Sequence, residues 1–149
     1  MIFKETLPWI FDVSPHTGVA KTQTRRPELP GDLCYTLDLQ ASERAGRKVY
    51  SLFGMGDEIG FVMQHGRLRF KVGLTYSVQP GRGKPSRGRI LLTAIRRCPV
   101  VADISPEDAV AEGFAMPGDF MAIIVKLYGK DALKNPFWAL TFDALGSAA

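Results

Sequence analysis

Glycine and proline divide this chain into short segments, and this division constrains the fold more than any other feature of the sequence. The clearest break covers residues 79–89, Gln-Pro-Gly-Arg-Gly-Lys-Pro-Ser-Arg-Gly-Arg, which suit neither a helix nor a central strand. Before it, residues 67–72 alternate basic and apolar side chains, as a half-buried strand does. After it, residues 90–95 are expected to form another strand. We therefore expect short, mostly antiparallel strands joined by turns, rather than a helical bundle or a doubly wound parallel sheet.

A smaller part of the chain carries helix signals. Ser105, followed by Pro106 and two acidic residues, is typical of a helix N-terminus, because serine caps free N–H groups and acids favour the positive end of the helix dipole. This helix should end at Gly113. A longer helix is expected over about 118–128, where apolar residues fall on one face. The aromatic cluster in residues 1–17 is expected to be core, with a short helix between its two prolines.

Composition limits the class of protein. A length of 149 residues favours a single domain, 1–149, and 46% hydrophobic residues suffice for a core. No apolar run approaches the roughly 18 residues of a membrane-spanning helix, and no signal-peptide pattern is present. Two cysteines without metal-binding spacing favour a reducing, cytoplasmic location, and Cys98 is expected to be a buried thiol. Two widely separated histidines argue against a histidine triad or zinc site, and we expect no metal and no cofactor.

The segment 21–27, Lys-Thr-Gln-Thr-Arg-Arg-Pro, concentrates groups that could perform chemistry. Lys21 and Thr24 are three residues apart, so the amine could accept the proton of the hydroxyl and activate it as a nucleophile. Arg25 and Arg26 could bind an anion or stack on a base. The alternative is a solvated basic loop, which is the usual fate of such a charge run.

Four further segments resemble, in order, the ASCH domain, a branch of the PUA-like superfamily. They are Gly73-Leu-Thr-Tyr-Ser-Val, then residues 89–95, then Asp103 to Phe114 with its Asp-Ala-Val-Ala-Glu-Gly-Phe, and the final Phe-Trp-Ala-Leu-Thr-Phe of 137–142. The resemblance spans roughly residues 18–142. It implies an α+β fold, a PUA-like (ASCH) mostly antiparallel β-barrel of about five to seven strands with two or three helices. The segment 28–70 is a long insert relative to this pattern, and we expect it to shape the pocket.

The resemblance also implies a function and a set of site residues. Some ASCH members are amidohydrolases that remove acyl groups from the exocyclic amine of cytosine nucleosides, and others bind or cleave RNA. Lys21, Thr24 and Glu112 match the family's functional positions, so we expect them to form one catalytic site. Thr24 would attack the acyl carbonyl and Lys21 would take its proton, while Glu112 would hold the lysine or protonate the departing amine. Without the family, Glu112 would be interpreted as a packing or ion-pairing residue.

Other residues are expected to bind the substrate. Arg26 could polarise the carbonyl or hold the ring oxygen, and Arg25 and Tyr76 are further candidates for substrate contacts. The small-molecule partner would be a nucleoside such as N(4)-acetylcytidine. No membrane partner is expected.

The alternative is an RNA-binding ASCH module, with or without ribonuclease activity. The cations that favour it lie in the glycine-proline loop of residues 79–89, namely Arg82, Lys84, Arg87 and Arg89. Such residues attract phosphates without reading sequence, although they also serve as solubilising surface. We expect this cationic loop to surround the catalytic cleft.

Overall fold

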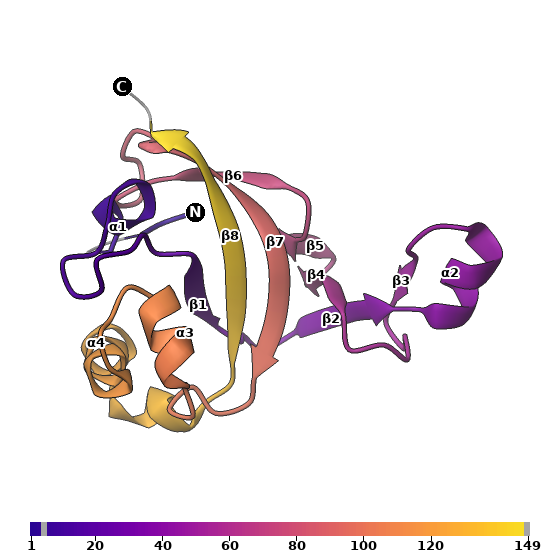
Figure 1. The fold of residues 1–149 in the computed structure, drawn as a ribbon. Coiled ribbons are helices and arrows are strands. Elements are labelled where there is room, and N and C mark those ends of the chain that lie inside the picture. The colour runs from indigo at the N-terminus through magenta and orange to yellow at the C-terminus, as the bar shows by residue number, and fades with distance from the viewer. Residues whose placement is uncertain (4–5, 148–149) are drawn as a thin grey trace.

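The protein is an α+β fold built on one antiparallel sheet (Figure 1). The computed structural model describes residues 1–3 and 6–147. Its strands are β1 (Gln23–Pro27), β2 (Asp32–Leu37), β3 (Tyr50–Ser51), β4 (Ile59–Gln64), β5 (Arg67–Lys71), β6 (Thr75–Val78), β7 (Gly88–Cys98) and β8 (Phe137–Ser147). Its helices are α1 (Pro8–Phe11), α2 (Leu39–Ala45), α3 (Pro106–Ala111), α4 (Pro117–Tyr128) and the 3-10 helix η1 (Lys130–Lys134).

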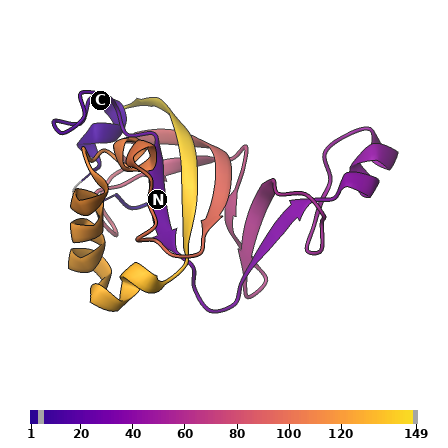
Figure 2. The same ribbon diagram turned by 60° about the horizontal axis from the view of Figure 1, so that its bottom comes forward.

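The sheet is open. Its strand order is β1-β8-β7-β4-β2-β3, with β5 beside β4 and β6 beside β7. In the described part of the chain the two ends of this path, β1 and β3, do not pair, so the expected closed barrel is wrong. The physical reason lies between β4 and β7, which meet only at Ile59 and Ile95. Beyond that point β2 and β4 diverge from the body and do not curl back to β1 (Figure 2). The α+β class and the antiparallel pairing are confirmed.

Two long central strands organise the core. The expected strands at 90–95 and 137–142 extend to 88–98 and 137–147, and β7 and β8 pair along nearly their whole length. Ile90 and Leu92 of β7 are fully buried, as are Leu140 and almost all of Trp138 in β8. The aromatic N-terminal segment covers one end of these strands, where Phe3 packs edge-on against Phe142. Cys98 is buried at the end of β7, as expected.

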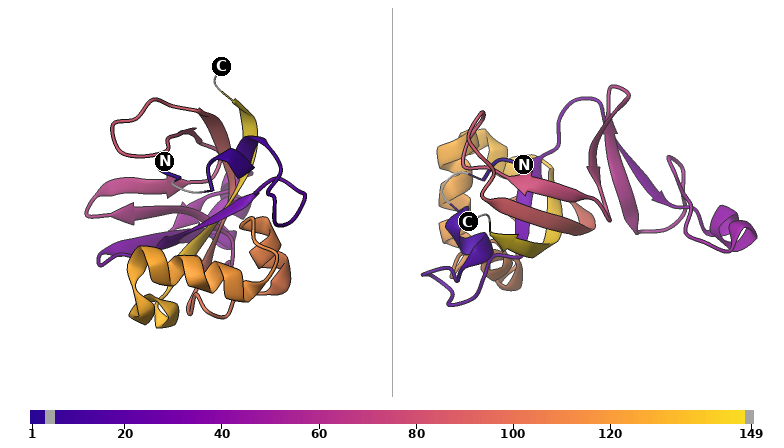
Figure 3. Two further views of the ribbon diagram at one scale, coloured as in Figure 1. Left: turned by 90° about the vertical axis from the view of Figure 1, so that its left-hand side faces the viewer. Right: turned by 90° about the horizontal axis from the view of Figure 1, so that it is seen from above.

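The helices α3, α4 and η1 lie together on one side of β1 and β8 (Figure 1; Figure 3, left). The Ser105 hydroxyl accepts the N–H of Asp108 at 3.1 Å and Pro106 occupies the first turn of α3, so the predicted helix start is confirmed. The predicted 118–128 helix is also confirmed as α4, whose Phe120 and Ile124 are buried against Phe137. None of the helices in residues 1–3 and 6–147 is long and apolar enough to cross a membrane.

Residues 32–58, here called the arm, project from the body (Figure 2; Figure 3, right). The arm contains β2, α2 and β3, and α2 has no buried residue. The tip exposes two large apolar side chains, with Phe53 at 90% and Met55 at 82% of full exposure. The arm is attached at its base by Asp32, whose buried carboxylate accepts from Arg69 and from the Trp138 indole N–H. The segment expected to be an insert, 28–70, therefore supplies the outer strands of the sheet, and its arm projects from the body.

Candidate functional site

Backbone hydrogen bonds fix the two residues that lead into β1, Lys21 and Thr22. The N–H of Lys21 donates to the carbonyl of Trp9 at 2.7 Å, and the N–H of Thr22 donates to the carbonyl of Ala111 at 2.9 Å. The first bond fixes the segment to the N-terminal helix α1, and the second fixes it to the end of α3. Because Glu112 directly follows Ala111, the second bond brings Glu112 beside Lys21, although the two are far apart in sequence.

Glu112 is the centre of a buried polar cluster. The Lys21 amine lies 3.3 Å from Glu112 Oε1 and also donates to the Glu112 carbonyl at 2.9 Å. The amide of Gln23 donates to Oε2 at 3.0 Å. Lys21 is only 4% exposed and Glu112 2%, so water contributes little to either. Both carboxylate oxygens thus accept from a fixed donor, and this arrangement suits a residue that holds the lysine.

The turn after Glu112 requires glycine. Gly113 has a φ of +99°, and a Cβ there would lie 2.6 Å from the Trp9 ring. The Ser14 hydroxyl donates a buried hydrogen bond to the carbonyl of Gly113 at 2.6 Å. The helix terminus that carries Glu112 is therefore fixed by close packing against the N-terminal segment.

Burial changes the acid–base character of Lys21. Desolvation lowers the pKa of its amine below the usual 10.5, and the positive charge of Arg26 lowers it further. The carboxylate of Glu112 opposes this effect by attraction and hydrogen bonding. An amine in this environment releases its proton more readily than an exposed lysine does, as a general base requires.

A second carboxylate extends the cluster to the surface. Arg25 Nη2 donates to Asp108 Oδ2 at 2.9 Å, and its Nε lies 3.8 Å from Glu112 Oε2. The same Asp108 oxygen accepts from the half-exposed Arg96 at 2.9 Å. Arg25 therefore lies between two acids, Asp108 of α3 and Glu112 directly after it, although its buried Nε makes no hydrogen bond.

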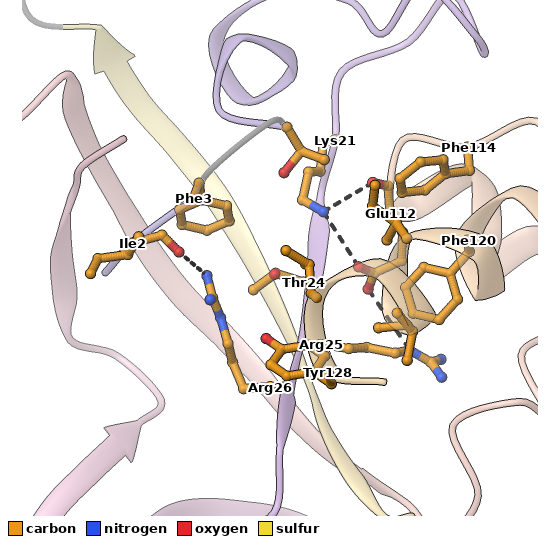
Figure 4. Close-up of a pocket in the computed structure, with 14 residues that line it drawn as sticks. Ile2, Phe3, Lys21, Thr24, Arg25, Arg26, Glu112, Phe114, Phe120 and Tyr128 are labelled. Atoms are coloured by element: carbon orange, nitrogen blue, oxygen red, sulfur yellow. Dashed lines mark hydrogen bonds and ion pairs between the residues drawn. The ribbon is translucent and has the colours of Figure 1, made fainter. Parts of the chain in front are cut away.

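The catalytic candidates line one pocket, a cavity of ≈ 130 Å³ between β1, α4 and the N-terminal segment (Figure 4). One wall is polar, and it comprises Lys21, Thr24, Arg25, Arg26 and Glu112. The other wall is mostly apolar, and it comprises Ile2, Phe3, Thr6, Phe114, Phe120, Ile123, Ile124, Leu127 and Tyr128. The three residues expected to cooperate, Lys21, Thr24 and Glu112, thus share a pocket with the expected substrate contact Arg26.

Other expected contacts lie elsewhere. Tyr76 does not line this pocket: its hydroxyl accepts the N–H of Lys71 at 2.9 Å, and its ring packs against the core of the sheet. The expectation that the cationic loop surrounds the pocket is also wrong, because its four cations, Arg82, Lys84, Arg87 and Arg89, are exposed and none lines the cavity. Arg89 instead donates to the hydroxyls of Thr75 and Ser77 on the neighbouring strand. No residue of 28–70 lines the pocket either.

Two residues of the polar cluster, Gln23 and Asp108, were not predicted from the sequence. Each had a detectable signal. Side chains in a strand alternate, so Gln23 shares a face of β1 with Arg25. Asp108 and Glu112 are four residues apart, which places both carboxylates on one face of α3. Across residues 1–3 and 6–147 we find no group of three or more His, Cys, Asp and Glu side chains that could hold a metal ion.

Comparison with known proteins adds little to this geometry. No family model matches the chain, and no curated protein matches it. Among solved structures, it is similar to the crystal structure of protein EF3133 from Enterococcus faecalis, described by the family model DUF984. That similarity has a TM-score of 0.48 and 12% identity, and it covers 98% of this chain and 75% of the other. The case for a function therefore rests on the residues of this chain.

Proposed function

We propose that this protein is an amidohydrolase that removes acyl groups from the exocyclic amine of cytosine nucleosides, with N(4)-acetylcytidine as the representative substrate. The observation that carries the proposal is the pocket that contains Lys21, Thr24 and Glu112 together. The ASCH-like order of motifs supports the same assignment. In that resemblance the same three residues occupy the functional positions.

The proposed reaction uses Thr24 as nucleophile and Lys21 as base. Thr24 is 6% exposed and lines the pocket, and its hydroxyl makes no hydrogen bond to another described residue, so the hydroxyl is available. Lys21 takes the hydroxyl proton as Oγ1 attacks the acyl carbonyl. When the C–N bond breaks, the resulting Lys21 ammonium returns this proton to the cytosine amine. The acyl group is left on Thr24 as an ester.

Water completes the cycle. Lys21 accepts a proton from the attacking water and delivers it to Thr24 Oγ1 as the ester bond breaks, so the acyl group leaves as a carboxylic acid. In this scheme Glu112 does not protonate the amine. Its oxygens accept from Lys21 and Gln23, and its role is to orient the lysine.

Arg26 is suited to stabilise the negative charge that develops on the carbonyl oxygen. It lines the pocket two residues after Thr24, and residues i and i+2 of a strand lie on the same face. In Figure 4 its guanidinium points away from that of Arg25 and toward Ile2. A cation already in place when an oxyanion forms contributes to catalysis without reorganisation.

RNA binding is the second candidate, and one observation favours it. Arg82, Lys84 and Arg87 are exposed in the loop between β6 and β7, and no ion pair engages them within the described residues. Such a loop attracts a phosphate backbone in a salt-dependent manner. This function would need no chemistry in the pocket.

One experiment separates the two. Purified protein is incubated with N(4)-acetylcytidine while the ultraviolet spectrum is followed, and a single-stranded RNA is tested by gel shift in the same buffer. Conversion of the spectrum to that of cytidine, with acetate released in equal amount, supports the hydrolase. Absence of turnover on acylated cytosines, combined with tight RNA binding, would assign the protein to the RNA-binding class.

A further inference from the structure

Arg26 is the cation of the pocket that lacks a carboxylate partner among the described residues. Lys21 is paired with Glu112, and Arg25 is paired with Asp108. Arg26 instead donates through Nη2 to the backbone carbonyl of Ile2 at 2.5 Å, and its guanidinium lies 4.9 Å from the centre of the Phe3 ring. The Tyr128 hydroxyl also hydrogen-bonds with the Arg26 side chain. The buried Nε of Arg26 has no acceptor, as is also the case for Nε of Arg25. Arg26 is thus a largely buried cation whose described partners are a carbonyl, a phenol and an aromatic ring, and buried charges are normally paired with an opposite charge, which a bound anion would supply.

The surroundings of Arg26 are mostly cationic. Three positively charged groups are close enough to repel the Arg26 guanidinium. They are the Lys21 amine, the α-amino group of Met1 and the guanidinium of Arg69. The opposing groups are the phenol of Tyr128 on α4 and the carboxylate of Glu112 at the end of α3. Glu112 already accepts from Lys21 and Gln23. In a poorly solvated cavity this excess of positive charge attracts an anion more strongly than the same charges would on the surface.

The apolar wall of the pocket determines which apolar group the anion can have. Phe120, Ile123, Ile124 and Leu127 of α4 give the cavity an apolar side opposite Arg26. The cavity volume is ≈ 130 Å³. A cavity of about 150 Å³ with similar aliphatic and aromatic walls is known to hold benzene. A single six-membered ring or a short aliphatic chain is therefore the size of group that this side accepts.

We propose that the pocket binds small organic carboxylates, with the carboxylate on Arg26 and a single ring or short chain against α4. Arginine suits this role because its guanidinium stays charged and carries five N–H donors, of which the Ile2 carbonyl uses one. This site goes beyond the proposed hydrolysis, since binding requires no turnover. If the hydrolysis also holds, the acid released from the substrate belongs to this ligand class and will inhibit the enzyme.

Isothermal titration calorimetry with benzoate tests the site, with benzamide as the neutral match of the same shape. We expect benzoate to bind at least about 10-fold more tightly than benzamide, as a charge-assisted hydrogen bond implies. Arg26→Gln should reduce benzoate binding to the level of benzamide, and Arg26→Lys should retain part of the preference. Arg44→Gln is the matched control, because Arg44 is exposed on α2 and does not line the pocket, and it should leave benzoate affinity unchanged.

A second measurement does not depend on any variant. Bound carboxylate adds negative charge near Lys21, so binding to the wild-type protein should take up protons and should tighten as the pH falls toward neutrality. Titrations in two buffers with different heats of ionisation report this uptake. Equal affinity for benzoate and benzamide, or full benzoate affinity in folded Arg26→Gln, would overturn the proposal. Because these titrations contain no acylated cytosine, a failure of the hydrolysis would leave their outcome unaffected.

Discussion

The amine of Lys21 and the carboxylate of Glu112, 91 residues apart in sequence, meet at 3.3 Å in the interior of the protein. The contact is made by the residues just before β1 and just after α3, which are joined by the backbone bond from Thr22 to Ala111. A buried pair of this kind contributes little net stability compared with an apolar pair, whereas loss of one partner is strongly destabilising. Its presence beside an available threonine therefore supports the proposed hydrolysis.

Removal of either reactive group should abolish hydrolysis. Thr24→Ala eliminates the nucleophile and Lys21→Met eliminates the base, so each should lower turnover of N(4)-acetylcytidine by at least about 100-fold. The double variant should be hardly worse than either single variant, because parts of one catalytic unit are not additive. Thr22→Ala is the matched control, since Thr22 is exposed and bonds through its backbone. Retained turnover in folded Thr24→Ala would exclude Thr24 as the nucleophile.

The pH dependence should follow Lys21. Its pKa is lowered mainly by burial, so turnover should rise with pH as the amine loses its proton and should reach a plateau below 10.5. Arg26 also lowers this pKa, so Arg26→Gln should move the midpoint of the rate profile to higher pH. A midpoint that stays in place in Arg26→Gln would mean that another group controls the profile.

Lys21 should also affect stability as a function of pH, with a defined sign. Between its lowered folded pKa and the unfolded value of 10.5, the unfolded chain binds more protons at Lys21 than the folded protein does. The contribution of Lys21 to the free energy of unfolding should therefore increase as the pH rises through this window. Urea unfolding of wild type and Lys21→Met at several pH values gives the difference directly. A difference independent of pH would show that the amine titrates normally.

Loss of the Glu112 carboxylate should destabilise the fold. Glu112→Ala leaves the Gln23 amide without its acceptor and the buried Lys21 amine without its carboxylate, with only the backbone carbonyl of residue 112 as acceptor. We expect a loss of about 3–5 kcal/mol in the free energy of unfolding. Glu112→Gln keeps the shape and should lose less. Glu58→Ala serves as the comparison, because Glu58 pairs with Lys48 at the surface, where solvent screens the interaction, and its urea midpoint should hardly change. A Glu112→Ala midpoint equal to that of Glu58→Ala would contradict a structural role for the buried pair.

Local signals predicted the elements better than their arrangement. The capping serine at 105 and the apolar face of 118–128 identified α3 and α4, because those signals act within one or two turns. Period-two alternation identified β5 but could not show that residues 75–78 leave it to pair with β7. The open edge of the sheet depends on the single junction of Ile59 and Ile95, a tertiary contact without local signature.

The candidate site was predicted only in part, because local signals do not show which distant residues meet in the fold. The spacing of Lys21 and Thr24 suggested a reactive pair, and only the family resemblance linked Glu112 to them. A strand pattern also does not indicate which end of the strand approaches a pocket. Tyr76 was therefore assigned to the substrate although its ring packs in the core.

The arm provides a last prediction through Asp32. Its side chain is fully buried and accepts from Arg69, from the indole N–H of Trp138 at 2.9 Å and from the N–H of Leu29 at 2.9 Å. Asp32→Ala leaves a guanidinium and an indole donor without their acceptor, so we expect a loss of about 3–5 kcal/mol in the free energy of unfolding. Trp138 fluorescence during urea unfolding reports this change.

Hydrogen exchange then distinguishes local from global loss. If Asp32 fastens the arm to the body, amides of β2 should exchange much faster in Asp32→Ala, whereas amides in the middle of β7, which pair with β8, should change less. Asp57→Ala is the matched control, because Asp57 is an exposed acid of the same arm and makes no ion pair with a described residue. Uniform acceleration across β2 and β7 would show that Asp32 supports the whole fold rather than the attachment of the arm.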